Sequence, residues 1–523
     1  MSELLPLWQL LAPQNVRIPR WPEPESECLK KIISAREYED PERWNRFLWH
    51  TAHIRELDLD LTSDSEEHRE AQLLLIQDIL KHNGGKSFLP ALCRIEWLGR
   101  SPADACVFTP LFTSTLRIAT FRFDEMDDPD PVIVTLLRRL CESSPFLADI
   151  TIDVGYTPEA ESSLVQELAA FDHLRGVTVN HLTQLSVFRD LITKSNVASV
   201  DVAEIEDPWL ALSPPFAVHN LCELSLGGQS GPLISLFQSV RFQALTHAKL
   251  SLFFSPEIHL TVGDVISLLA SFCTAVSLSS LQNLELSIDG FLPRDDPSMD
   301  EFALGDVVAP ILPLRNMSCF RFSTSETIYW SADDADIRML AQAWSKLEEL
   351  ILACATLPPR PTPSSALHHL CHYCPNLQEV VLPCIRCPVV GVDSIPAPAP
   401  DRAPHGLSYL YVHGCVSAHG ADLLDAEAEG LARYILELFS DLDIEGYRFA
   451  LDECERARAS YVDGAFDTAA GALEPGWQKV MQYMCSIDVG EGLGLSQMQL
   501  SISFAGYRKT RALRGGLGVP GLP

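Results

Sequence analysis

The strongest constraint on the fold is a six-residue pattern that repeats at a fixed distance between residues 336 and 382. Residues 347–352 and 377–382 both place apolar side chains at positions 1, 4 and 6, and each follows a helical pattern, at 337–343 and 366–373. Side chains alternate between the two faces of a strand, so positions 4 and 6 point to one side. A single helix–strand pair cannot bury that side, whereas stacked copies of the pair can.

The same pattern recurs along most of the chain. Consecutive starts lie 23 to 38 residues apart, which suits one strand plus one helix. Single matches carry little weight in a sequence that is 47% hydrophobic, so the argument rests on the spacing. The starts are Ile54, Leu92, Ile118, Leu147, Leu174, Val197, Leu221, Leu245, Leu281, Met317, Leu347, Leu377 and Leu407.

Helical patterns lie between these strand patterns, at 66–81, 131–143, 159–171, 232–240, 262–271 and 333–344. Ser65, Pro158 and Ser331 are the residue types that start helices. We therefore expect an α/β leucine-rich-repeat solenoid of about 13 irregular units over residues 53–415, with parallel strands on the concave face and helices on the convex face. The alternative is an ordinary pair of α/β domains.

The segments outside the array predict its ends. Residues 1–52 do not match the pattern and are expected to form an N-terminal cap; residues 416–485, with helical patterns at 421–439 and 475–484, are expected to form a C-terminal helical cap. Residues 486–523 are expected to be a disordered tail, and the alternative is an interaction tail because four basic residues cluster in it: Arg508, Lys509, Arg511 and Arg514. Proline-rich segments at 124–131, 293–300, 358–363 and 395–404 predict surface loops.

Charge and composition narrow the partner and the compartment. A net charge of −31 and a pI near 4.8 argue against binding to nucleic acid or to an anionic membrane surface. They suit either a basic protein partner or simply a solvated acidic surface. Because the start lacks the basic region of a secretory signal and no apolar run is long enough to span a bilayer, we expect a reducing cytoplasmic or nuclear location, with the 15 cysteines as buried thiols.

The sequence motifs that could indicate a metal site or a catalytic site are weak. Cys371, Cys374, Cys384 and Cys387 form two C-x-x-C pairs that suit a four-thiolate zinc site, although the intervening strand pattern would hold the pairs apart. The 228–231 segment lacks the spacing of a serine nucleophile elbow, and 84–86 lacks the rest of a phosphate-binding loop and more plainly ends a helix. We therefore expect no cofactor, no metal and no enzymatic activity.

The concave face is the candidate binding site. Positions 3 and 5 of each unit point onto it, and acidic residues outnumber basic ones there, which suits a mixed or basic protein surface. Its C-terminal end adds an apolar and aromatic patch, the composition of binding hot spots. The alternative is that the insert at 395–404 or the helix at 421–439 covers this patch. The candidate partner-binding residues are Glu349, Ile351, Glu379, Val381, Tyr409, Tyr411 and His413.

Three features together resemble the F-box and leucine-rich-repeat proteins, in particular their divergent fungal branch. They are the Cys-Pro-Asn-Leu junction at 374–377, the Trp-Asn-Arg-Phe entry at 44–47, and the apolar pair Leu7-Trp8. The resemblance covers most of the chain. It implies that the repeats bind a substrate protein while an F-box docks on the Skp adaptor of a cullin–RING ubiquitin ligase (SCF complex).

The sequence departs from that family at its start. The family expects a Leu-Pro-led helical segment of about forty residues upstream, and Leu7-Trp8 corresponds only to its end. The chain is therefore expected either to start late or to have lost the adaptor-binding module. The ligase role would need an F-box upstream or its replacement by residues 1–50. A leucine-rich-repeat binding protein unconnected with ubiquitination is the alternative reading.

Overall fold

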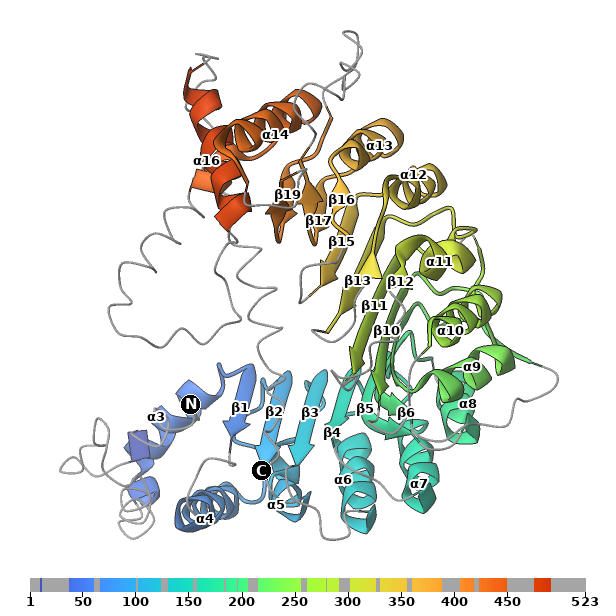
Figure 1. Ribbon diagram of the computed structural model, residues 1–523. Helices are drawn as coiled ribbons and strands as arrows, with labels where there is room; N and C mark the ends of the chain where they lie inside the picture. The colour runs from blue at the N-terminus through green and yellow to red at the C-terminus, as the bar shows by residue number, and fades with distance from the viewer. Residues whose placement is uncertain are drawn as a thin grey trace.

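Thirteen parallel strands form one continuous sheet, in which the strands follow one another in chain order (Figure 1). They are β1 (Glu56–Asp60), β2 (Arg94–Gly99), β3 (Ile118–Phe123), β4 (Asp149–Asp153), β5 (Gly176–Leu182), β6 (Ser199–Ile205), β8 (Glu223–Gly228), β10 (His247–Phe254), β11 (Asn283–Gly290), β13 (Cys319–Thr324), β15 (Glu349–Cys354), β17 (Glu379–Leu382) and β19 (Tyr409–Val412).

The computed structural model describes most of the chain. The described residues are 10–11, 37–60, 66–99, 102–123, 130–153, 158–182, 185–194, 196–205, 215–254, 261–278, 280–290, 302–325, 330–354, 360–387, 405–417, 423–448 and 475–490. The expected loops at 293–300 and 395–404, and the tail beyond Gly490, lie outside these residues.

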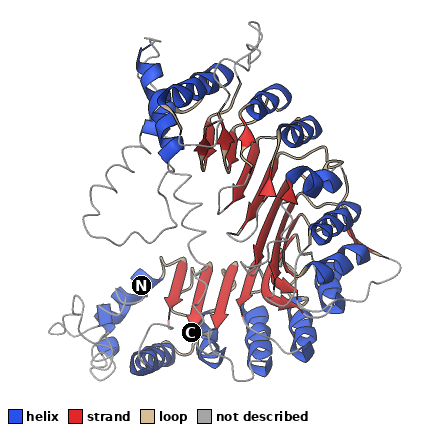
Figure 2. Cartoon of the chain, in the orientation of Figure 1, coloured by secondary structure: helices blue, strands red, loops and turns tan. Residues whose placement is uncertain are grey.

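Helices connect the strands and cover one side of the curved sheet (Figure 2). They are α4 (Glu66–His82), α5 (Pro102–Val107), α6 (Asp130–Ser143), α7 (Pro158–Leu168), α8 (Leu185–Lys194), α9 (Ser230–Ser239), α10 (Val262–Ala275), α11 (Leu304–Val308), α12 (Asp334–Ala343) and α13 (Ser365–Tyr373). A parallel sheet needs such crossovers because each strand must return to the same end before the next begins. The predicted parallel α/β architecture is confirmed, and its curved form is consistent with a solenoid.

The core lies between the sheet and the helices. In unit after unit the residues at positions 1, 4 and 6 are almost fully buried, as with Leu347, Leu350 and Leu352 at 0% exposure. Positions 3 and 5 alternate with them and stay partly exposed, as the burial pattern of β15 shows. Twelve of the thirteen six-residue patterns begin two residues before a strand of the main sheet, so the sequence located these strands correctly.

The third unit was predicted in the wrong phase. Ile118 pairs with Arg94, which is a position-3 residue, so the unit starts at Leu116 and not at Ile118. Leu116, Ala119 and Phe121 are the buried residues, at 0–1% exposure. The error arose because both phases satisfy an apolar 1-4-6 pattern, and only the pairing with β2 separates them. Position 5 of this unit is therefore Thr120, and Arg122 lies two residues further along the same face.

Helix boundaries also follow local signals. The first turn of α12 is closed by a reciprocal capping box between Asp333 and Asp336, so Asp333, and not Ser331, is the N-cap. A second capping box joins Thr261 and Asp264 at α10. Ser331 instead belongs to the two-residue strand β14 (Trp330–Ser331), which pairs with β12 (Phe302–Ala303).

Short parallel pairings outside the main sheet had no sequence signal. β7 (Phe216–Val218) pairs with β9 (Val240–Phe242), and β16 (Thr362–Pro363), β18 (Ile385–Arg386) and β20 (Cys415–Val416) form a three-stranded sheet. Two or three residues are too few for a periodic pattern. The expected loop at 358–363 is thus partly a strand.

Both ends of the sheet are covered. At the first end, α3 (Pro41–Thr51) buries Phe47 against Phe88, and Trp44 lies edge-on to His82 of α4. At the last end, α14 (Asp425–Leu438) packs on α13 and on α16 (Pro475–Gly490). α16 continues five residues into the segment expected to be disordered, 486–523. The two helical patterns expected at this end are confirmed.

Candidate protein-binding face

The inner face of the sheet is a ladder of directly aligned side chains. Residues at position 3 pair from strand to strand without interruption, from Glu56 of β1 to Tyr409 of β19. Those at position 5 form a second row beside it, which ends with Val381 and Tyr411. Since the helices α4 to α13 lie on the other side, these rows form the concave face of the molecule (Figure 1).

Four basic residues of this face, Arg94, Arg122, Lys249 and Arg321, lie in ion pairs with carboxylates of the same face. Arg94 and Arg122 both contact Glu96, at 3.2 and 3.7 Å. Lys249 Nζ lies 3.3 Å from Glu285 Oε1. The remaining cation, Arg321, is paired as described next.

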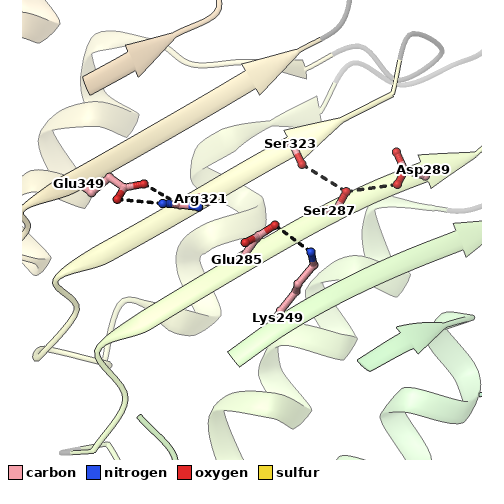
Figure 3. Close-up of polar contacts among 7 residues, drawn as sticks. All are labelled: Lys249, Glu285, Ser287, Asp289, Arg321, Ser323 and Glu349. Carbon is pink, nitrogen blue, oxygen red and sulfur yellow. Dashed lines mark hydrogen bonds and ion pairs between the residues drawn. The ribbon is translucent and has the colours of Figure 1, made fainter. Parts of the chain in front are cut away.

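Arg321 and Glu349 form a two-pronged pair across β13 and β15 (Figure 3). Arg321 Nη2 donates to Glu349 Oε2 at 3.0 Å, and Nε donates to Oε1. This bond to the carboxylate raises the pKa of the Arg321 guanidinium and keeps it charged. Partial burial of the nearby Cys319 thiol, together with the charge of Glu349, raises the pKa of that thiol to about 12. The middle of the face, from β10 to β15, is therefore largely self-neutralised.

Strands β4 to β8 leave an acidic stretch without such compensation. Asp149, Asp201 and Glu223 project from it, and none of them has an ion pair or side-chain hydrogen bond among the described residues. Burial raises the pKa of the Asp149 carboxyl, the exposed Arg175 beside it lowers that pKa, and the charge of Glu223 raises it again. Small residues separate these carboxylates. A Cβ at Gly176 would lie 2.4 Å from Asp149 Oδ1, so a side chain there would require the Asp149 carboxylate to turn away.

A bulge in β6 shapes the edge of this stretch. The pairing of β6 with β8 shifts between Val202 and Ile205. The Ala203 carbonyl consequently lies where a Cβ of Gly227 would be, at 1.8 Å, and Gly228 adopts a φ of 143°. The two successive glycines therefore lie where the backbones of β6 and β8 approach each other closely. The phenyl ring of Phe253 covers Gly227 and is 38% exposed.

The C-terminal end of the face is apolar and aromatic, as the sequence predicted. Ile351, Val381 and Tyr411 are directly aligned across β15, β17 and β19. The imidazole of His413 lies edge-on to the Tyr411 ring, with centroids 5.0 Å apart. Burial lowers the pKa of His413, which favours the neutral ring. All of these side chains are half-buried, so the patch is accessible but already packed at its base.

The acidic residues of this patch take two different positions. Glu349 is held by Arg321, whereas Glu379 lies between Glu349 and Tyr409 in the position-3 row. Six of the seven sequence-predicted residues thus lie side by side on three strands, and His413 directly follows the last of them. Their proximity is confirmed, and their binding role stays a prediction.

The helix expected as a cover does not lie over the patch. α14 packs against α13 on the outer layer, and the insert at 395–404 lies outside the described part. Residues 444–448 cover one edge instead. Tyr447 stacks on Tyr409, with ring centroids 6.4 Å apart, and its hydroxyl both donates to the Leu410 carbonyl at 2.6 Å and accepts from the Leu410 amide at 2.7 Å.

The four cysteines of the C-x-x-C pairs are not arranged as a zinc site. Cys371 Sγ donates to the Leu438 carbonyl at 3.4 Å, whereas Cys374 Sγ faces carbonyls of α12 and its end, at 3.6–3.7 Å. Cys384 and Cys387 flank β18 in the small outer sheet. Burial raises the pKa of both Cys374 and Cys387 to about 12, which favours the neutral thiol over the thiolate that zinc requires.

The glycine segments at 84–86 and 228–231 have structural roles in the described part of the chain. Among the described residues, no group of three or more His, Cys, Asp or Glu side chains is placed to hold a metal ion. Gly84 and Gly85 take φ values of 66° and 76°, and the Gly85 amide donates to the Leu80 carbonyl, so 84–86 ends α4 as expected. Gly228–Gly231 joins β8 to α9. A polar pocket of about 630 Å³, lined by Glu348, Gln378 and Ser408 among others, lies at the starts of the last strands.

No helix within the described ranges is long and apolar enough to cross a membrane.

Comparisons with known proteins identify no relative of this chain. The sequence matches no protein-family model, and a search of curated proteins finds no significant relative.

Proposed function

We propose that this protein is a non-enzymatic recognition scaffold, a leucine-rich-repeat solenoid whose concave face binds another protein. The observation that carries the proposal is the aligned inner face of the 13-stranded sheet. Its backbone positions are fixed by continuous pairing, while its side chains change from acidic at β4–β8 to paired at β10–β15 and aromatic at β19. A rigid surface of graded chemistry suits selective protein binding, because little entropy is lost on association.

The test compares binding by matched variants. Val381→Lys combined with Tyr411→Ala alters the aromatic end of the face, whereas Leu74→Asp alters a residue that is 55% exposed on α4. Each protein is immobilised, and retained proteins from a cell extract are quantified by mass spectrometry. We expect the wild type and Leu74→Asp to retain a specific partner and the concave variant to retain at least about tenfold less of it, since aromatic hot-spot contacts contribute about 2 kcal/mol or more. Equal retention on all three proteins would refute the proposal.

A narrower proposal connects the scaffold to ubiquitination. It is supported only by the resemblance to F-box and leucine-rich-repeat proteins, in which the repeats present a substrate and the N-terminal module binds the Skp adaptor. A cytoplasmic or nuclear location, which we also propose, suits that role. A binding protein unconnected with ubiquitination is the alternative.

The adaptor link is tested by a pull-down of purified Skp adaptor with the full chain. The matched variant is Leu7→Ala with Trp8→Ala. Deleting residues 1–50 would be a poor control, because it removes the buried Phe47 and exposes Phe88. Binding that is lost in the variant supports the ligase role. No binding by the full chain leaves the unconnected scaffold.

A further inference from the structure

We propose that the chain's own C-terminal segment, residues 497–514, docks on the concave face and competes with the protein partner there. The inference rests on the proposed function, since it concerns the same face. It draws on three observations: the distribution of charge along the face, the place where the described chain ends, and the composition of the segment that follows.

The face offers two complementary regions at a defined separation. The uncompensated carboxylates Asp201 and Glu223 lie on β6 and β8, and the apolar residues Val381 and Tyr411 lie on β17 and β19. Six strand steps separate β6 from β17 in the sheet. At about 4.8 Å per step, the two regions lie roughly 29 Å apart or less, because the face is concave.

The C-terminal segment carries the matching chemistry in the matching order. Its first part alternates apolar and polar residues, with Met498, Leu500, Ile502 and Phe504 between glutamines and serines. Its second part holds Arg508, Lys509, Arg511 and Arg514, while the only acidic residue after Gly490 is Glu491. Eight residues separate Ile502 from the middle of the basic cluster, about 26 Å of extended chain. In a chain of net charge −31, this is a local reversal of sign.

The described structure ends beside the apolar region. Arg448 Nη2 donates to the carbonyl of Cys485 in α16 at 3.2 Å, so the last turns of α16 lie against residues 444–448. Tyr447 of that segment stacks on Tyr409 of β19. Eight residues from Gly490 to Met498 span up to about 26 Å, enough to reach the neighbouring Tyr411 and Val381. The apolar part then meets the apolar region first, and the basic part extends toward β8 and β6.

Two structural details favour a basic segment at β6–β8. The cations on the strands that border the acidic stretch are already paired, Lys249 of β10 with Glu285 and Arg122 of β3 with Glu96, so they do not neutralise Asp201 and Glu223. The exposed Arg175 lies nearby, and its charge lowers the pKa of Asp149. Small residues such as Ser199 and Ser225 leave room beside the two carboxylates for long arginine and lysine side chains.

The test uses the full chain throughout. In the tail variant, Arg508, Lys509, Arg511 and Arg514 are all replaced by alanine. The probe is a fluorescent peptide of residues 497–514, and its binding is followed by anisotropy. We expect the tail variant to bind the peptide at least about tenfold more tightly than the wild type does, because the tethered segment competes at an effective concentration near the millimolar range.

Matched face variants locate the binding. Adding Asp201→Lys with Glu223→Lys to the tail variant is expected to weaken peptide binding at least about tenfold, and adding Tyr411→Ala is expected to weaken it as well. The control adds Glu42→Lys with Glu70→Lys, two exposed acidic residues on α3 and α4, and changes the net charge equally. This control is expected to leave binding within about twofold.

Several results would overturn the inference. They are equal peptide binding by the wild type and the tail variant, equal binding of a scrambled peptide, or equal weakening by the control pair. Concentration-dependent self-association that is lost in the tail variant would assign the segment to a second copy instead. If the partner test succeeds while the peptide does not bind, the scaffold function stands and this inference fails. If the peptide binds while the partner ignores the concave variants, the proposed function fails.

Discussion

At the scale of single residues, Tyr447 completes the edge of the sheet. Its hydroxyl satisfies both the amide and the carbonyl of Leu410 on the last strand, and its side chain is only 3% exposed. Tyr447→Phe leaves both backbone groups buried without that partner. We expect a loss of about 1–3 kcal/mol in the free energy of unfolding, measured by urea denaturation. Tyr373→Phe, on the outer helix α13, is expected to change stability by less than about 0.5 kcal/mol.

Glycines 227 and 231 lie four residues apart and are expected to respond oppositely to alanine. A Cβ at Gly227 would clash with the Ala203 carbonyl at 1.8 Å, whereas nothing lies within 4 Å of one at Gly231 in α9. Gly227→Ala is therefore expected to cost about 1–3 kcal/mol. Gly231→Ala is expected to be neutral or to stabilise by up to about 1 kcal/mol. Thermal unfolding of the pair measures both, and a neutral Gly227→Ala would show that the bulge relaxes freely.

The buried cysteines give a chemical prediction. Cys374 and Cys387 have pKa values of about 12, so only about one thiol in ten thousand is ionised at pH 8. We expect them to resist alkylation in the folded protein and to react once it is denatured, while the partly exposed Cys222 reacts in both states. Peptide mapping by mass spectrometry follows this. Fast labelling of Cys374 in the native protein, or about one equivalent of bound zinc, would contradict the buried-thiol assignment.

At the scale of elements, α3 stabilises the first end through one buried ring. Phe47 is 0% exposed against Phe88, whereas Trp49, two residues later, is 63% exposed. Phe47→Ala is expected to destabilise the protein by about 3–5 kcal/mol, and Trp49→Ala by less than about 0.5 kcal/mol. Denaturation curves of the two variants test this. Similar small effects would mean that α3 packs only loosely on the first end of the sheet.

Element positions were largely predictable from the sequence, because a strand with one buried face and its covering helix both carry periodic apolar signals. Leu347 and Leu377 located their strands correctly. Ile118 did not, since two phases of the pattern were equally apolar and only pairing with β2 decides between them. The pairing of β16 with β18, and the return of Tyr447 to Leu410, join residues far apart without local periodicity. Such contacts can be seen only in three dimensions.

The candidate site was predictable in part. Strand alternation placed Val381 and Tyr411 on one face, and they are adjacent there. The charge distribution of the site could not be predicted as well. A count of acidic and basic residues does not show that Arg321 and Lys249 are neutralised by their neighbours. The uncompensated charge at Glu223 emerges only once those pairs are known.

At the scale of the whole molecule, stability should be local. Each strand of the main sheet pairs only with the strands before and after it, so damage at one end reaches the other through many intermediate interfaces. We expect Phe47→Ala to reduce hydrogen-exchange protection of β1 and β2 strongly and to leave that of β15 and β17 nearly unchanged. Peptide-resolved exchange measures this. A uniform loss along the sheet would mean that the array unfolds as one cooperative unit.

The closure of the last strand by Tyr447 also limits how such a chain can change in length over evolution. A new unit appended after β19 would have to displace that hydroxyl from Leu410 and separate Tyr409 from its stacked neighbour. A helix–strand pair inserted between two internal strands would meet the same kind of parallel neighbour on both sides. Longer or shorter descendants of this protein should therefore differ by insertion or loss within the array, while both termini keep their own sequence.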